Sequence, residues 1–224
     1  MTPANNGSAP VVSPADGYRR LREAIIGGRF QPNERLVEAD LSEAFGIPRA
    51  VVRTALVRLE QEGLIEHERY RGARVRLVTE QEAIEILEAR AALEALAARR
   101  AAARAGEAEQ RKLAAILDRM RSALAETDLF LMSELNSQLH AEIIEMAGSA
   151  TVSRLVSMLN SQIVRFQYRT ILVPGRPESS LREHEAIVAG IAAHDQAGAA
   201  AAMTVHLSRV MEAVSTLSRL FGGR

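Results

Sequence analysis

Hydrophobic residues near the start of the chain recur every three to four positions, which is the spacing of amphipathic helices. One such block covers about 16–27 and ends at a pair of glycines. Two further blocks lie within 36–66, and the tripeptide Gly46-Ile47-Pro48 separates them. Gly46 can adopt the left-handed conformation that ends a helix, and Pro48 suits the first turn of the next helix. Two short helices joined by such a turn predict a helix-turn-helix.

Residues 63–78 predict a small β-hairpin, because two apolar runs flank the segment Tyr70-Arg71-Gly72 and Gly72 suits the turn. A helix-turn-helix followed by a hairpin is a winged helix. The segment 1–14 is rich in Pro, Asn, Ser and Gly and predicts a disordered leader, which leaves 15–78 as a winged-helix domain.

From Thr79 onward the pattern is helical throughout, and Thr79 with Glu82 forms a capping box at its start. Short breaks divide 79–224 into six predicted helices: 80–105, 107–125, 127–147, 149–171, 178–194 and 195–221. Amphipathic helices with short connections predict an antiparallel bundle. The fold class expected is mainly α, with an N-terminal winged helix-turn-helix and a C-terminal all-α bundle.

The composition narrows the classes of function. The 224 residues hold 28 basic and 28 acidic side chains, so the formal net charge is zero. That balance argues against a strongly basic, sequence-blind coat for nucleic acid. The chain has no cysteine, which excludes disulfides and thiolate metal sites. No apolar run is long enough for a membrane span and no signal peptide is evident, so we expect a cytoplasmic protein without membrane contact.

Two arginines on the second predicted helix suit DNA recognition. Arg49 and Arg53 are four positions apart and therefore share one helix face, from which arginine forks can reach guanine in the major groove. At the tip of the wing, Arg71 would reach the minor groove beside Gly72. A helical hairpin with surface arginines also occurs in proteins that bind no DNA, and this pattern alone does not decide between the two.

The chain has five histidines, and three of them lie in the middle of three different predicted helices. These are His140, His184 and His206; Asn136 lies one turn before His140 on the same helix face. A bundle core can gather such side chains, and imidazoles bind zinc, nickel, iron or copper. Taken singly, each histidine is better explained as a structural residue than as a ligand, and the spacing leaves their convergence open.

Residues 17–78 resemble the winged-helix domain of the GntR superfamily of bacterial transcription regulators. The resemblance depends on residues spread through the whole domain: Leu21, Ile25, Gly28, Pro32, Arg35-Leu36-Val37-Glu38, Leu41, Gly46-Ile47-x-Arg49, Val52-Arg53, Ala55-Leu56, Leu59, Glu62-Gly63-Leu64 and Arg71-Gly72-Ala73-x-Val75. The family often has Ser before the first arginine and Thr-Pro after it, where this chain has Pro48 and Ala50-Val51. The resemblance implies a homodimer that binds an inverted-repeat DNA operator.

Residues 80–221 resemble the FCD effector domain of the FadR subfamily of these regulators. The motifs that match are Glu88-Ala89-Arg90-x-x-Leu93-Glu94, Asn136-x-x-Leu139-His140, Ala147-Gly148, Glu183-His184-x-x-Ile187-x-x-Gly190-Ile191, Asp195-x-x-x-Ala199 and Met203-x-x-His206-Leu207. The resemblance implies a divalent metal on Asn136, His140, His184 and His206, with zinc favoured over nickel, iron or manganese. Asn136 stands where the family commonly has Asp, and the missing negative charge should weaken the metal.

The same resemblance implies that a small carboxylic-acid effector pairs with Arg90 in the pocket. An ion pair with Glu94, four residues further along the helix, is the other interpretation of Arg90. Arg165 and Tyr168, on a later helix, are further candidates for effector contact. The function expected is that of a ligand-responsive transcription regulator, with repression as the expected direction. A metal-sensing regulator is the first alternative and a metal-dependent enzyme the second, although no motif supplies a general base or a nucleophile.

Overall fold

The computed structural model describes residues 13–68 and 72–221, except for the side chains of 68, 164–169 and 218–221. The chain forms two compact units, Met1–Leu77 and Val78–Arg224. Each unit has its own hydrophobic core, so each is described by itself.

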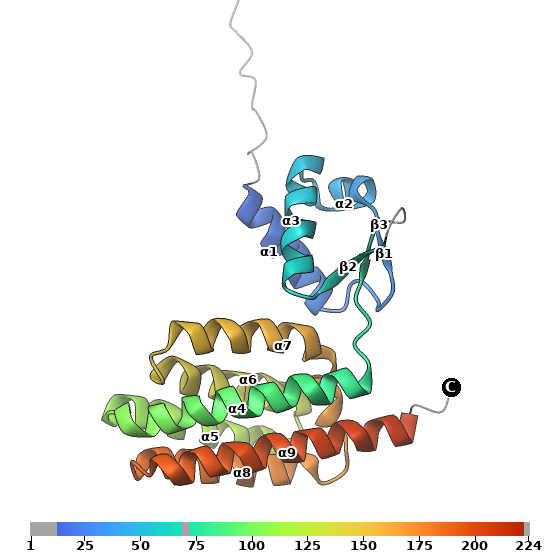
Figure 1. Cartoon of the computed structure of the whole chain (residues 1–224). Coiled ribbons are helices and arrows are strands. Elements are labelled where there is room, and N and C mark those ends of the chain that lie inside the picture. Colours follow the sequence, from blue (N-terminus) through green and yellow to red (C-terminus); the bar gives the residue numbers. More distant parts are fainter. Residues whose placement is uncertain (1–12, 69–71, 222–224) are drawn as a thin grey trace, which may run out of the picture. The chain divides into compact units, whose positions relative to one another are not determined.

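The N-terminal unit is a winged helix (Figure 1). Its elements in chain order are α1 (Pro14–Ile26), β1 (Arg35–Leu36), α2 (Glu38–Phe45), α3 (Arg49–Gln61), β2 (Ile65–Glu68) and β3 (Gly72–Val75). Within the described residues the strands form one antiparallel sheet in the order β1-β3-β2, with Leu36 opposite Ala73 and Ile65 opposite Val75. Gly46 has φ 61° and ψ 38°, the left-handed conformation that ends α2. Helices α1 and α3 contact each other, and Leu21, Val52 and Leu59 are buried in the core of the unit.

Two features of this unit differ from the sequence-based expectation. Helix α1 begins at Pro14 rather than near Asp16, because the Ser13 hydroxyl accepts a hydrogen bond from the Asp16 backbone N–H and Pro14 occupies the first turn. Strand β1 was not expected. It consists of only Arg35 and Leu36 and is held by pairing with β3, so no alternating pattern could indicate it.

The C-terminal unit is an all-α bundle, as the sequence predicts. Its described residues form α4 (Glu80–Arg104), α5 (Glu107–Ala125), α6 (Leu129–Met146), α7 (Ala150–Thr170), α8 (Arg176–Ala192) and α9 (Gln196–Phe221). Helix α4 begins at a Thr79 cap, whose hydroxyl accepts a hydrogen bond from the Glu82 backbone N–H. It contacts α6, α7, α8 and α9, and it lies alongside α9 over much of its length (Figure 1).

Helices α8 and α9 are in close contact, which brings the helices of His184 and His206 together. Gly190 lies so near the start of α9 that a Cβ added there would stand 2.8 Å from the Ala199 backbone nitrogen. Ala199 itself is fully buried. The two helices that carry His184 and His206 therefore approach backbone to backbone. Within the described part of the chain, no helix combines the length and the apolar character that crossing a membrane requires.

Candidate functional site

Three imidazoles from three helices converge inside the bundle. His140 is on α6, His184 on α8 and His206 on α9, and all three side chains are buried. The His140 Nε2 atom is 3.3 Å from Nε2 of His184 and 3.2 Å from Nε2 of His206. One ring nitrogen of each residue lies within 4.8 Å of the others. The convergence that the sequence left open is therefore present.

Two carboxylates bind the outer nitrogens of this cluster. The Glu94 carboxylate, on α4, accepts a 2.5 Å hydrogen bond from Nδ1 of His140, and Glu183 accepts one of 2.8 Å from Nδ1 of His206. With Nδ1 donating, each Nε2 keeps a lone pair that faces the cluster.

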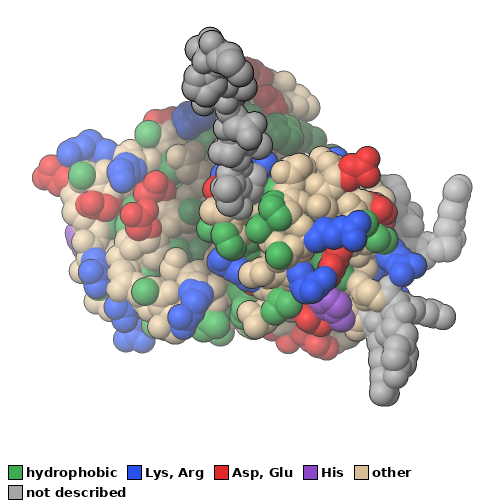
Figure 2. Space-filling view, turned by 90° about the horizontal axis from the view of Figure 1, so that it is seen from above, with side chains coloured by type: hydrophobic (Ala, Val, Ile, Leu, Met, Phe, Trp, Pro, Cys, Tyr) green, Lys and Arg blue, Asp and Glu red, His purple; other side chains and the backbone are tan. Residues whose placement is uncertain are grey.

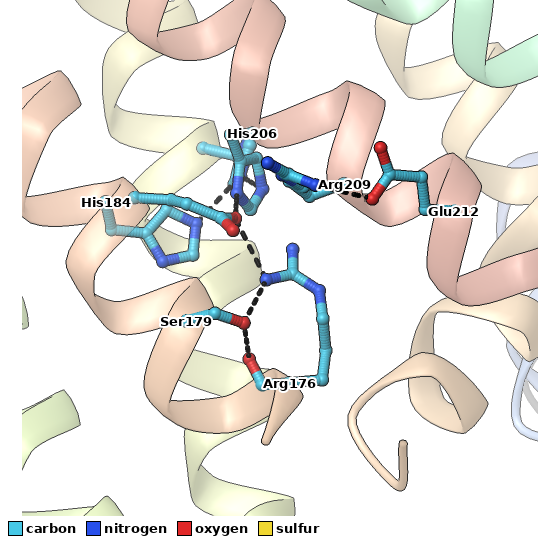
Figure 3. Close-up of polar contacts among 8 residues, drawn as sticks. Arg176, Ser179, His184, His206, Arg209 and Glu212 are labelled. Carbon is cyan, nitrogen blue, oxygen red and sulfur yellow. Dashed lines mark hydrogen bonds and ion pairs between the residues drawn. The ribbon is translucent and has the colours of Figure 1, made fainter. Parts of the chain in front are cut away.

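An arginine neutralises each carboxylate. Arg90 contacts Glu94 Oε1 through Nη2 at 2.6 Å and Nε at 2.8 Å, and Arg176 donates to Glu183 Oε2 at 2.9 Å. Figure 3 shows Arg176 reaching toward the histidines from the first turn of α8, with Ser179 beside its guanidinium. The site thus contains two arginine–carboxylate–histidine chains, one through α4 and one through α8.

The burial of these groups controls their charge. Burial alone would raise the pKa of Glu94, but the Arg90 guanidinium and the His140 imidazole outweigh it and hold the pKa at about 2. Burial lowers the pKa of His184 and of His206 well below the ordinary value, and neighbouring imidazoles lower it further. Burial raises the pKa of Glu183, against the opposing effect of Arg176. Near neutral pH, His184 and His206 are uncharged, which is the form that binds metal.

The cluster fits a divalent metal by its donor chemistry. Nitrogens that share a tetrahedral zinc at about 2.0–2.1 Å stand roughly 3.3 Å apart, close to the separations between the Nε2 atoms here. The Nδ1 atom of His184 is buried and has no hydrogen-bond partner among the described residues. A proton on that nitrogen would leave Nε2 of His184 as a third lone pair toward the cluster. His140, His184 and His206 could therefore hold the metal together.

The other residues expected at this site take different places. Asn136 is half-buried and lines a pocket together with His140, His206, Arg90 and Arg176. Arg90 both lines this pocket and forms the ion pair with Glu94, so the two interpretations of its role combine. Arg165 and Tyr168 belong to α7, but their side chains lie outside the described residues.

The DNA-facing candidates are exposed on the winged helix. Arg49 is the first residue of α3 and Arg53 lies one turn later, and both are exposed on the same face of the helix. Both ends of the Arg53 fork contact Glu38 on α2, with Nε at 3.1 Å and Nη2 at 3.0 Å from its carboxylate oxygens. Gly72, with φ 86°, starts β3, whereas Arg71 lies outside the described residues. Figure 2 shows one face of the molecule on which basic and acidic side chains are interspersed, in keeping with the net charge of zero.

Sequence reasoning missed Glu183 and Arg176. Glu183 directly precedes His184 and resembles an ordinary helical surface carboxylate. Arg176 follows Pro174-Gly175, a dipeptide that indicates a boundary between helices. One signal was available for Glu183. Its matching position in the FCD motif lies beside a ligand histidine, where a second carboxylate partner is common at metal sites.

Comparison with protein families and individual proteins agrees with this architecture. The FCD domain family matches residues 85–209, and the family described as bacterial regulatory proteins, gntR family, matches residues 16–75. The HTH-type transcriptional repressor GlaR of Escherichia coli (strain K12) is 30% identical over 204 residues, which are 88% of this chain and 93% of that protein. The HTH-type transcriptional repressor RspR of the same strain is 28% identical over 197 residues, covering 88% of this chain and 86% of that one.

A solved structure agrees at the level of the fold. E. coli McbR/YncC has a TM-score of 0.76 at 17% sequence identity, with 91% of this chain and 97% of that chain covered. At this identity the likeness bears on the fold alone.

Proposed function

We propose, from the premise that this chain belongs to the GntR family of bacterial regulatory proteins and carries an FCD domain, that it is a ligand-responsive repressor of the FadR subfamily. Membership makes it a DNA-binding transcription regulator, and the families and relatives compared are regulators rather than enzymes. The names of GlaR and RspR support repression as the direction. A protein that acts on bacterial DNA works in the cytoplasm.

DNA recognition in this proposal depends on α3. Arg49 and Arg53 read guanines in the major groove, while Arg71 and Gly72 at the wing reach the neighbouring minor groove. Two chains pair as a symmetric dimer, and their recognition helices read the two halves of an inverted repeat. Support comes from the exposure of both arginines on one face of α3.

The ligand-responsive part depends on one observation, the convergence of three Nε2 atoms. His140, His184 and His206 would hold a divalent metal, with zinc favoured. Asn136, which lines the same pocket, would be a fourth, neutral ligand. When bound, such a metal attracts the oxygen of an anion as a Lewis acid. A small carboxylic acid is the effector of the proposal. The acid can change DNA binding only if the protein binds it with different affinity in two arrangements of the DNA-binding units.

The DNA part is tested with an operator selected from random duplexes by the purified chain. Arg49→Ala should weaken operator binding by about 1–3 kcal/mol in mobility shifts. Arg20→Ala, an exposed arginine of α1, serves as the control. Undiminished sequence-specific binding by Arg49→Ala would remove that residue from the interface.

The effector part is tested by a thermal-shift screen of zinc-loaded protein against small carboxylic acids, because a ligand of the native state raises its melting temperature. A metal-sensing regulator is the second candidate, since the ligands come from three separate helices that a metal would draw together. Titration of operator binding with zinc alone, and then with acids on zinc-loaded protein, separates the two. A response to zinc that no acid alters would favour the sensor.

A further inference from the structure

We infer that Arg176, rather than Arg90, is the residue that recognises the carboxylate of the effector. This inference rests on the proposed function, because it assumes that an acid enters the histidine pocket. It assigns the anion contact to the first turn of α8, where sequence reasoning placed none.

Both arginines line the pocket and both are buried, with exposed fractions of 3% for Arg90 and 8% for Arg176. Their hydrogen bonds differ. Both Nε and Nη2 of Arg90 donate to one oxygen of Glu94, a carboxylate that is 0% exposed. The other oxygen of Glu94 contacts His140. If Arg90 turned away from Glu94, it would leave a buried charge without its counter-ion. Its Nε–Nη2 edge therefore stays on Glu94, and only the remaining N–H groups of Nη1 and Nη2 could meet a ligand.

Arg176 has spare donors. Its contacts with Glu183 and Ser179 both use Nη1, at 2.9 Å and 3.3 Å. Within the part of the chain that the structure describes, its Nε and Nη2 have no hydrogen-bond partner. These two atoms form one edge of the guanidinium, and such an edge binds a carboxylate with two parallel hydrogen bonds.

The position of Arg176 brings that edge close to the metal-binding cluster. Its Nη1 and Nδ1 of His206 share a single atom, Oε2 of Glu183, so only one carboxylate oxygen lies between the guanidinium and the imidazole. Arg176 also lines a second, outer groove between α8 and α9, together with Arg182 and Arg209. Arg176 therefore lines both the histidine pocket and the outer groove. An acid that enters from the groove would meet Arg176 first and could then reach the cluster.

The ligand class follows from this placement. The anion must be small, because it has to contact both the histidine cluster and the guanidinium of Arg176, and only the Glu183 carboxylate lies between these two groups. The hydroxyls of Thr170 and Ser180 and the apolar side chains of Ile171 and Val210 also line the pocket. A short carboxylic acid with a small, partly polar body matches these walls.

The test is calorimetric titration of the zinc-loaded full-length chain with a panel of short mono- and dicarboxylic acids, each paired with its neutral amide. We expect an acid to bind and its amide not to bind. Arg176→Gln should weaken that acid by at least about 30-fold, since one member of a buried charge pair is lost. Zinc affinity is measured for every variant by competition with a chromophoric chelator, and acid binding is compared at full zinc occupancy. Arg182→Gln, an exposed neighbour on α8, is the matched control and should bind the acid as the parent does.

A second variant protects the test against misfolding. Arg176→Lys keeps the charge beside Glu183 but lacks the planar fork, so it should fold normally and still lose most of the acid affinity. If the parent binds an acid and both folded Arg176 variants bind it equally well, the inference is wrong while the proposed function stands. If the parent binds none of the acids, the effector part of the proposed function fails and the inference falls with it.

Discussion

Glu94 is a fully buried carboxylate whose two oxygens serve different partners. One oxygen pairs with Arg90 and the other accepts the hydrogen bond from Nδ1 of His140. The side chain thereby fixes which ring nitrogen of His140 faces the cluster. Such outer partners of metal-binding histidines orient the ring and raise its basicity.

Replacing this carboxylate with an amide should therefore have two effects. We expect Glu94→Gln to lower zinc affinity by about 10- to 100-fold, because Nδ1 of His140 loses its negatively charged acceptor. The free energy of unfolding should also fall by about 3–5 kcal/mol, because Arg90 keeps a buried charge without a counter-ion. Chelator competition measures the first effect and urea denaturation the second. Glu88→Gln, an exposed carboxylate on the same helix, should change neither quantity. Full zinc affinity in folded Glu94→Gln protein would show that the carboxylate does not orient His140.

Helices α2 and α3 are linked at the proposed DNA face by the Glu38–Arg53 ion pair. Its side chains are 36% and 70% exposed, so solvent screens the pair and it adds little to stability, and Arg53 can exchange this partner for a base.

Glu38→Gln should consequently leave folding almost unchanged while altering discrimination between DNA sequences. We expect tighter binding to random duplexes, because a negative charge near the phosphates is removed, and a smaller preference for the selected operator. Fluorescence anisotropy at several salt concentrations measures both affinities. The idea fails if the ratio of specific to non-specific binding stays at the parental value.

Because α8 and α9 approach closely at Gly190, we expect substitution of this glycine to affect both stability and zinc binding. An alanine there would place its Cβ against the backbone of Ala199. We expect Gly190→Ala to cost about 1–3 kcal/mol of stability and to weaken zinc, because His184 and His206 move apart. Melting curves with and without zinc measure this, with the exposed Ala189→Ser as the control. Parental zinc affinity in the Gly190 variant would mean that α9 accommodates the methyl group without displacing His206.

Element by element, the sequence anticipated most of the fold and less of the site. Long periodic segments with glycine or proline at their ends predicted the helices of the bundle within a few residues. The two-residue strand β1 exists only through pairing with β3, which local periodicity cannot express. The three histidines could be located on helices, but their meeting depends on how α6, α8 and α9 pack. The role of Arg176 could not be predicted, because it depends on the pocket that the side chain lines and not on the Pro-Gly turn before it.

At the scale of the whole molecule, the two units have separate cores and only one contains the histidine cluster. Removal of bound metal should therefore affect them unequally. In differential scanning calorimetry, we expect a chelator to lower the transition of the C-terminal unit and to leave that of the winged helix nearly unchanged. Re-addition of zinc should restore the profile. Equal shifts of both transitions would argue that the metal lies elsewhere or that the units unfold together.

The paired arginines and carboxylates around the cluster determine the net charge of the pocket. Arg90 with Glu94 and Arg176 with Glu183 cancel each other's charge, so a bare pocket offers an incoming acid little net attraction. A divalent cation would add two uncompensated positive charges, and these would attract an anion. If the proposed function holds, a cell short of that cation would respond weakly to the acid even when the acid is abundant.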